Sequence, residues 1–156
     1  MLNAILDGWT LSTIFIWRSG APLNITDSSD RNLDGQTNDR PNLVGEANLS
    51  HNRPQSEQVE EWFNRAAFAR VPLGEDGNAG RNIVEGPGRT NIDLALFRDF
   101  KLSRGTRLQF RMEATNAFNI VNLMNPGTNL NASSTFGRIR EARPMRQVQL
   151  GLRLSF

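Results

Sequence analysis

The last eleven residues of the chain are RQVQLGLRLSF, in which every second residue from Val148 to Phe156 is apolar. Val148, Leu150, Leu152, Leu154 and Phe156 occupy every second position. A β-strand sends successive side chains to opposite faces, so this segment would have one apolar and one polar face. A soluble edge strand can show this pattern. A strand between lipid and a polar lumen also shows it, and the terminal aromatic favours that interpretation.

The composition of the 156-residue chain excludes several classes of protein. Only 38% of the residues are hydrophobic, and no run of about 18 apolar residues could form a transmembrane helix. Alternating transmembrane strands remain compatible with this composition. The absence of cysteine excludes a disulfide framework and thiol chemistry. Because 18 basic residues are spread among 16 acidic ones, we expect no nucleic-acid partner.

The N-terminal segment, MLNAILDGWTL, has neither a basic n-region nor an apolar h-region. It therefore does not read as a signal peptide. A secreted or outer-membrane chain needs such a peptide, so either the protein is cytosolic or residues are missing upstream of Met1.

Four segments have the pattern of strands: residues 8–26, 91–102, 106–118 and 144–156. Each has at least roughly the 9–11 residues needed to cross a bilayer at a tilt. Long polar segments, 27–90 and 120–143, separate them. The first of these includes a helical patch, residues 56–68, for which we expect Ser56 to be the cap.

The segments 91–102 and 106–118 are joined through Ser103, Arg104 and Gly105. A two-residue turn would place Leu96 beside Glu113 and mix the two faces. A three-residue loop keeps the faces separate, and glycine suits the left-handed residue that ends such a loop. We therefore predict the three-residue loop, with the pairs Leu96–Met112, Leu94–Ala114, Phe100–Leu108, Phe97–Arg111 and Ala95–Glu113.

Short turns and long loops lie on opposite sides of outer-membrane barrels. If residues 103–105 form a periplasmic turn, the terminal strand descends to the periplasm and residues 27–90 are extracellular. The sequence thus predicts an all-β fold. It consists of about four antiparallel transmembrane strands from the C-terminal end of a larger outer-membrane barrel, with long polar extracellular loops and one short helix.

Several segments of the sequence resemble those of a known family. They are GWTLSTIFIWRSGAPLNIT, DGQTNDRPNLVG, WFNRAAFA, GRNIVEGPGRTNIDLALFRDF, LQFRMEATNAFNIVN and FGRIREARPMRQVQLGLRLSF. Together they resemble the C-terminal end of TonB-dependent outer-membrane receptors, in particular Oar-like receptors with a carboxypeptidase-regulatory-like N-terminal domain. The resemblance covers nearly the whole chain, and the order of the segments matches.

This resemblance implies a barrel of about 22 strands, filled by an N-terminal plug domain and used for energised uptake of a solute. Four strands cannot close a barrel, so we expect the chain to be a fragment of such a receptor in the bacterial outer membrane. The implied partners are outer-membrane lipid, the rest of the barrel and its plug, the barrel-assembly machinery, and TonB through the N-terminal part.

The resemblance also implies that the terminal strand is the signal read by the barrel-assembly machinery. The residues of this assembly signal would be Leu150, Leu152, Leu154 and Phe156. The alternative is an ordinary amphipathic edge strand.

A cluster of oxygen-bearing side chains resembles the first half of a calcium loop. Its members are Asp30, Asn32, Asp34, Asn38 and Asp39. Oxygen ligands at alternate positions followed by Gly35 suit Ca²⁺, but the twelfth position is Pro41 rather than a bidentate glutamate. The alternative is a solvated turn cluster.

The strands also carry a polar face, which in a barrel would line the lumen and contact a plug or a solute. It includes Asp93, Asp99, Arg107, Arg111, Glu113 and Arg153. The alternative is a solvated, charge-balanced face. The aromatic residues near the strand ends suit the interface girdles of a barrel, or else the core of a soluble sheet. They are Trp9, Trp17, Phe100, Phe118 and Phe156.

No catalytic constellation is present in the sequence. His51 is the only histidine, so neither a histidine metal cluster nor a catalytic triad can be built. We expect a protein that is not an enzyme and that has no cofactor other than, in the calcium interpretation, Ca²⁺. The alternative function is that of a soluble antiparallel β-domain that binds carbohydrate or calcium.

Overall fold

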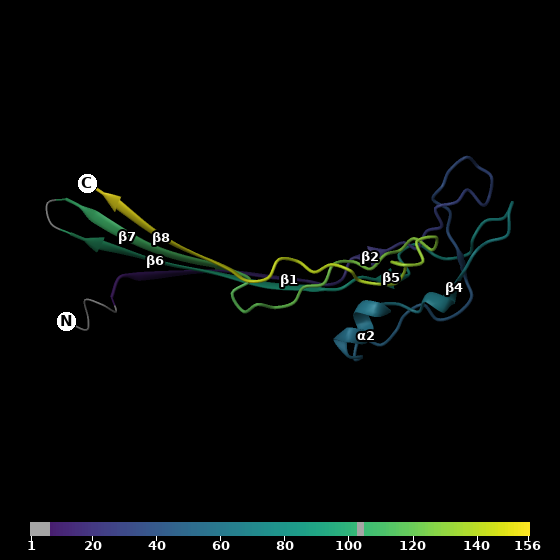
Figure 1. Cartoon of the computed structure of the whole chain (residues 1–156), viewed down its shortest axis with the longest axis horizontal. Coiled ribbons are helices and arrows are strands. Elements are labelled where there is room, and N and C mark those ends of the chain that lie inside the picture. The colour runs from purple at the N-terminus through teal and green to yellow at the C-terminus, as the bar shows by residue number, and fades with distance from the viewer. Residues whose placement is uncertain (1–6, 103–104) are drawn as a thin grey trace. The chain divides into compact units, whose positions relative to one another are not determined.

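A computed structural model describes residues 7–102 and 105–156 of the chain (Figure 1). These residues divide into two compact units. The first unit comprises the described residues up to Arg18 together with 89–122 and 143–156, and the second comprises 19–88 and 123–142. The second unit is therefore built from the two long segments that connect the strands of the first.

The first unit is a four-stranded antiparallel sheet with the order β1-β6-β7-β8 (Figure 1). Its strands are β1 (Trp9–Arg18), β6 (Arg89–Lys101), β7 (Arg107–Thr115) and β8 (Gln147–Ser155). β7 and β8 alternate in polarity, β6 does so with exceptions at Ala95, Phe97 and Arg98, and the pairing of these three strands joins like faces. β1 is apolar on one face but also carries Ile14 and Ile16 on the other. The sheet confirms the predicted all-β fold.

The register of β6 and β7 confirms the pairing predicted from the alternation of side chains. Leu96 pairs with Met112, and Phe97 pairs with Arg111. Gly105 has a left-handed backbone, with φ of 84°. Ser103 and Arg104 of the predicted three-residue loop lie outside the described residues.

Two strands end earlier than the alternation predicts. The first ends at Arg18 rather than at residue 26. β7 ends at Thr115, because Asn116 adopts a left-handed backbone with φ of 47°. The side-chain amide of Asn116 accepts a hydrogen bond from the backbone N–H of Ile120 (2.9 Å) and donates one to its carbonyl oxygen (2.9 Å). These bonds stabilise a turn that replaces the last residues of the predicted strand.

The second unit contains short elements only. They are β2 (Pro22–Leu23) paired with β5 (Val84–Glu85), β3 (Asn42–Leu43) paired with β4 (Phe68–Ala69), helix α2 (Gln55–Glu60) and the 3₁₀ helix η1 (Arg65–Ala67). The predicted helical patch is thus divided between α2 and η1.

The prediction that Ser56 caps the helix is wrong. Pro54 occupies the cap position of α2, and no side chain bonds to the helix start there. Ser56 lies inside the helix, where its helical backbone cannot form a cap. A side-chain cap is found instead at η1, where Asn64 accepts a hydrogen bond from the backbone N–H of Ala66.

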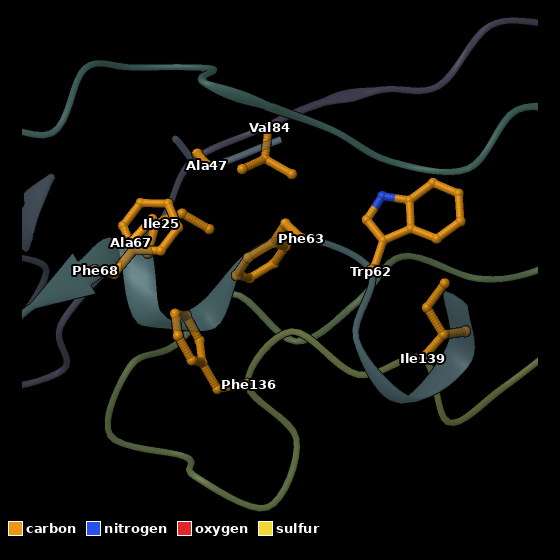
Figure 2. Packing of buried hydrophobic residues seen from close by; sticks show 9 residues of the cluster. All are labelled: Ile25, Ala47, Trp62, Phe63, Ala67, Phe68, Val84, Phe136 and Ile139. Carbon is orange, nitrogen blue, oxygen red and sulfur yellow. The ribbon is translucent and has the colours of Figure 1, made fainter. Parts of the chain in front are cut away.

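An apolar core occupies the centre of the second unit, although its segments were predicted to be polar loops (Figure 2). Phe63, Phe68 and Phe136 pack edge to face, with ring centroids 5.2 to 6.0 Å apart. Phe63 is only 1% exposed. The indole N–H of Trp62 donates to the carbonyl oxygen of Glu85 (2.7 Å). Because Phe136 comes from the second connecting segment, the two segments share one core.

Polar contacts join the same two segments. The backbone N–H of Ile139 donates to the carbonyl oxygen of Val59 (2.8 Å). The carboxylate of Glu60, at the end of α2, forms ion pairs with Arg138 (3.3 Å) and Arg140 (3.3 Å). The connecting segments therefore form one folded body rather than two independent loops.

Candidate functional site

One face of the four-stranded sheet is apolar across all four strands. Leu11 pairs with Leu96, Phe110 with Leu152, and Met112 with Leu150. The side chains of this face are exposed on the edge strands β1 and β8, where Leu152 is 72% exposed, and mostly half-buried on the central strands β6 and β7. A contiguous exposed apolar surface marks a contact with a membrane or a partner.

The predicted assembly-signal residues belong to this apolar face or follow it directly. Leu150, Leu152 and Leu154 lie on β8, on the same side as the apolar residues of β7. Phe156 comes after the last residue of β8 and is fully exposed. β8 is also an edge strand of the sheet, so its outer backbone groups are available to another strand.

The strands have the length that a bilayer requires. β1, β7 and β8 contain 10, 9 and 9 residues, which matches the 9–11 residues of a tilted transmembrane strand. Trp9 and Trp17, near opposite ends of β1, are both exposed rather than buried in a core. Aromatic side chains at both ends of an apolar band are typical of the girdles of outer-membrane barrels.

Arg98 was missed by the sequence analysis and lies on the apolar face. Its register partners are Trp9 and Phe110. The side chain is buried, at 8% exposed, and its guanidinium carbon lies 4.6 Å from the ring centroid of Phe100 and 5.3 Å from that of Trp9. Aromatic faces attract a cation, so these rings stabilise a charge on an apolar surface. The two-residue spacing between Leu96, Arg98 and Phe100 would have revealed this placement.

The opposite face of the sheet is mostly polar, although Ile14, Ile16 and Phe97 also lie on it. It collects the residues predicted to line a lumen. The register places six of them on one side of the sheet: Asp93, Asp99, Arg107, Arg111, Glu113 and Arg153. Arg111 and Glu113 form an ion pair (2.5 Å), and the amide of Gln109 donates to Asp99 (3.1 Å). Polar side chains on this face therefore pair with one another through ion pairs and hydrogen bonds.

Two hollows lie against the polar face. The smaller, of about 210 Å³, is lined by Asp99, Arg107, Gln109, Arg153 and Ser155. The larger, of about 790 Å³, includes Asp93 and Glu113 in its lining.

Asp93 has a structural role in addition to its place on the polar face. Its Oδ1 atom accepts hydrogen bonds from the side-chain amide of Asn91 (2.7 Å) and from the backbone N–H of Asn116 (2.8 Å). Both asparagines are buried. Asp93 therefore fixes the turn that follows β7 to the neighbouring strand β6.

The predicted calcium cluster is a set of hydrogen-bonded turns. The carboxylate of Asp30 accepts from the backbone N–H groups of Asp34 (3.0 Å) and Gly35 (3.0 Å). Asp39 accepts from the backbone N–H of Asn32 (3.1 Å). Among residues 7–102 and 105–156, no three His, Cys, Asp or Glu side chains are grouped as metal ligands. Calcium binding stays a prediction of the sequence, which isothermal titration with Ca²⁺ would test.

The carboxylate of Asp27 joins the two connecting segments. The side chain is 0% exposed. It accepts hydrogen bonds from the backbone N–H of Ser29 (3.1 Å), from the Ser29 hydroxyl and from the amide of Asn131, and it lies 4.0 Å from Arg70. Burial raises the pKa of Asp27, but the bonds from Ser29 and Asn131 and the charge of Arg70 outweigh this effect. The net result is a pKa below the ordinary value of 3.8.

We expect the second unit to lose stability in acid because of Asp27. A lowered pKa in the folded state stabilises the fold above pH 3.8, and this contribution is lost as the pH falls through the folded-state pKa. Asp27→Asn is expected to make the free energy of unfolding of the second unit less dependent on pH in this acidic range. Urea unfolding followed by Trp62 fluorescence, with Trp9 and Trp17 replaced by phenylalanine, measures it. An unchanged pH dependence in Asp27→Asn would refute the assignment.

The arrangement defines a class of protein. In the part of the chain that the structure describes, no helix is long and apolar enough to cross a membrane. The sheet combines an exposed apolar face, a polar face and strands of bilayer-spanning length, which is the construction of a transmembrane β-sheet.

The chain belongs to the outer membrane beta barrel domain family, whose model matches residues 1–149. It is therefore located in the bacterial outer membrane. No curated protein and no solved structure matches it.

Proposed function

We propose that the chain is the C-terminal part of the barrel of a TonB-dependent outer-membrane receptor that takes up a solute. The observation that carries this proposal is the common register of four strands, which separates an apolar face from a polar one. The sequence segments that resemble TonB-dependent receptors support the assignment of the chain to these receptors within the outer membrane beta barrel family.

In this proposal the sheet closes the barrel. β1 and β8 are its edge strands, and their outer backbone groups would pair with the neighbouring strands of the barrel. The apolar face would contact lipid and the polar face would contact the plug domain. The connection between β6 and β7 would be periplasmic, so the two long connections, which leave from the other ends of these strands, would be extracellular.

The upstream coding sequence is the most direct test of the receptor class. We expect an in-frame signal peptide, a plug domain and a TonB-coupling segment. Uptake by the full receptor would then stop when the proton-motive force is dissipated. An upstream region that encodes a barrel without a plug would contradict energised uptake while leaving the membrane-spanning sheet intact.

Phe156 is expected to act in assembly through the barrel-assembly machinery. Phe156→Ala in the full-length protein should reduce the amount of folded barrel severalfold, because the exposed terminal aromatic would no longer be recognised. The heat-modifiable fraction on gels, measured in isolated outer membranes, reports the folded barrel. Ser155→Ala, one position earlier and on the polar face, is the matched control. Equal folded amounts in the two variants would refute the assembly role.

A further inference from the structure

The second unit contains a hollow of about 340 Å³ that is lined by residues of this unit alone. Its lining consists of amide, hydroxyl, carboxylate and guanidinium side chains and the backbone of Gly77. This volume is at the lower end of the range found for small-molecule sites, about 300–1,000 Å³. A lining without apolar side chains suits a ligand that is polar on every side.

One wall of the hollow is held in place by hydrogen bonds between distant residues. Asp39 accepts from the backbone N–H of Asn32, and the Asn32 side chain donates to Asp76 (2.8 Å). Gly77 packs so closely on Arg40 that a Cβ atom there would lie 1.8 Å from the Arg40 carbonyl oxygen. These contacts fix residues 76–77 against residues 39–40 before any ligand binds.

The opposite wall is anchored by the core of the unit. Ile25 is buried in that core, and its neighbours Asn24 and Thr26 line the hollow. The side-chain oxygen of Asn24 accepts from the backbone N–H of Asn82 (2.8 Å), and the backbone N–H of Thr26 donates to the Thr128 carbonyl (3.1 Å). The walls are therefore parts of the folded unit rather than free loops.

Several polar groups in the lining have no partner within the described residues. The Thr26 hydroxyl, which is half-buried, and the exposed Arg81 guanidinium and Asn38 amide make no hydrogen bond or ion pair there. Arg40 uses one nitrogen, which donates to the Ala79 carbonyl (3.0 Å), and its other donors remain available. The hollow thus offers both donors and acceptors to a ligand.

We propose that this hollow binds a neutral saccharide, one or two sugar rings in size. Two positive side chains, Arg40 and Arg81, are balanced by two negative ones, Asp39 and Asp76, so the site does not select an ion by its net charge. Sugar hydroxyls both donate and accept, which matches the mixed lining. The inference rests on the proposed function only where it identifies this saccharide as the solute that the receptor takes up.

Saturation-transfer NMR tests the proposal with the whole chain in lauryldimethylamine oxide, a detergent without a sugar headgroup. The probes are maltose, cellobiose and lactose. We expect at least one of them to bind with a dissociation constant of about 1 mM, since the lining has no aromatic side chain for a sugar ring to stack on. Arg81→Gln and Thr26→Val should each weaken binding about threefold to tenfold, the effect of one lost hydrogen bond.

The controls separate recognition from folding. Neither Arg81 nor Thr26 makes a side-chain hydrogen bond in the described part of the chain, so both variants should unfold at the same urea concentration as the parent. Glu57→Gln, an exposed change on α2 away from the hollow, should bind as the parent does.

Three outcomes would overturn the proposal. They are no saturation transfer to any of the three sugars, equal binding by Arg81→Gln and the parent, or tighter binding of glycylglycine or inorganic phosphate. Binding does not require an energised membrane. Sugar binding without energised uptake would therefore refute the proposed receptor function but not the saccharide site. Energised uptake without sugar binding would refute only the saccharide site.

Discussion

Replacing Leu152 by arginine is expected to destabilise the folded outer-membrane protein by about 2–4 kcal/mol, the cost of a cation on the lipid face near the bilayer midplane. Leu152 lies in the central part of β8, and its side chain is on the apolar face opposite Phe110. Its exposure of 72% leaves an introduced guanidinium without protein groups that could cover it. Urea unfolding of the full-length protein in phospholipid vesicles measures the free energy of unfolding.

The matched control for Leu152→Arg is Gln149→Arg in the same strand. Gln149 lies on the polar face and pairs with Glu113, so an arginine there gains an opposite charge rather than lipid. We expect this variant to stay within about 0.5 kcal/mol of the parent, as surface substitutions usually do. Equal losses in the two variants would show that the even-numbered side chains of β8 do not face lipid.

Truncating Phe63 to alanine is expected to destabilise the second unit by about 3–5 kcal/mol. Phe63 is at the centre of that core and contacts the rings of both Phe68 and Phe136. Its loss leaves a cavity and removes the contacts that join the two connecting segments. Urea unfolding reported by Trp62 fluorescence, with Trp9 and Trp17 replaced, follows this unit.

Leu73→Ala is the control for Phe63→Ala, because Leu73 is an exposed apolar residue of the same unit. Its truncation should change the free energy of unfolding by less than about 0.5 kcal/mol. A loss below about 1 kcal/mol in Phe63→Ala would mean that the connecting segments are not held together by this aromatic core.

The pairing of the sheet could be predicted from the sequence because the side-chain period of a strand is two. A one-residue slip between β6 and β7 would place Leu96 beside Glu113, so only one register keeps the faces separate. The ends of the strands could not be predicted in the same way. The predicted third strand extended to about Phe118, but the left-handed Asn116 ends β7 at Thr115 through local hydrogen bonds.

The core of the second unit could not be predicted from local patterns. Phe63 and Phe68 belong to the predicted helical patch, but they are separated from Phe136 by the whole of β6 and β7, so no local pattern predicts that the three rings pack together. The high content of Asn, Asp, Gly and Pro in these segments predicted solvated loops, which is right for their surface. The few aromatic side chains form their interior, where Phe63 of the first segment contacts Phe136 of the second.

The register places the six predicted residues on one face of the sheet, as the alternation indicates, while their position in a lumen stays a prediction. Their partners depend on side-chain conformation, which the pattern does not give; Asp93, for example, bonds to a buried turn rather than to a cation. The hollow of the second unit was not predicted, since Thr26, Asn38 and Arg81 are brought together only by the fold.

The central claim is that the sheet crosses the outer membrane with its apolar face in lipid. The 156 residues contain no cysteine, so within them a single cysteine can be introduced at each position from Val148 to Leu154. It is spin-labelled in the full-length protein, with any upstream cysteine replaced by serine. Accessibility to oxygen, which concentrates in lipid, and to a water-soluble nickel chelate can then be measured in vesicles by electron paramagnetic resonance.

We predict high oxygen accessibility at 148, 150, 152 and 154 and low oxygen accessibility at 149, 151 and 153, with a period of two. High accessibility to the nickel chelate at Leu150 and Leu152, or no alternation along β8, would contradict the membrane-spanning sheet.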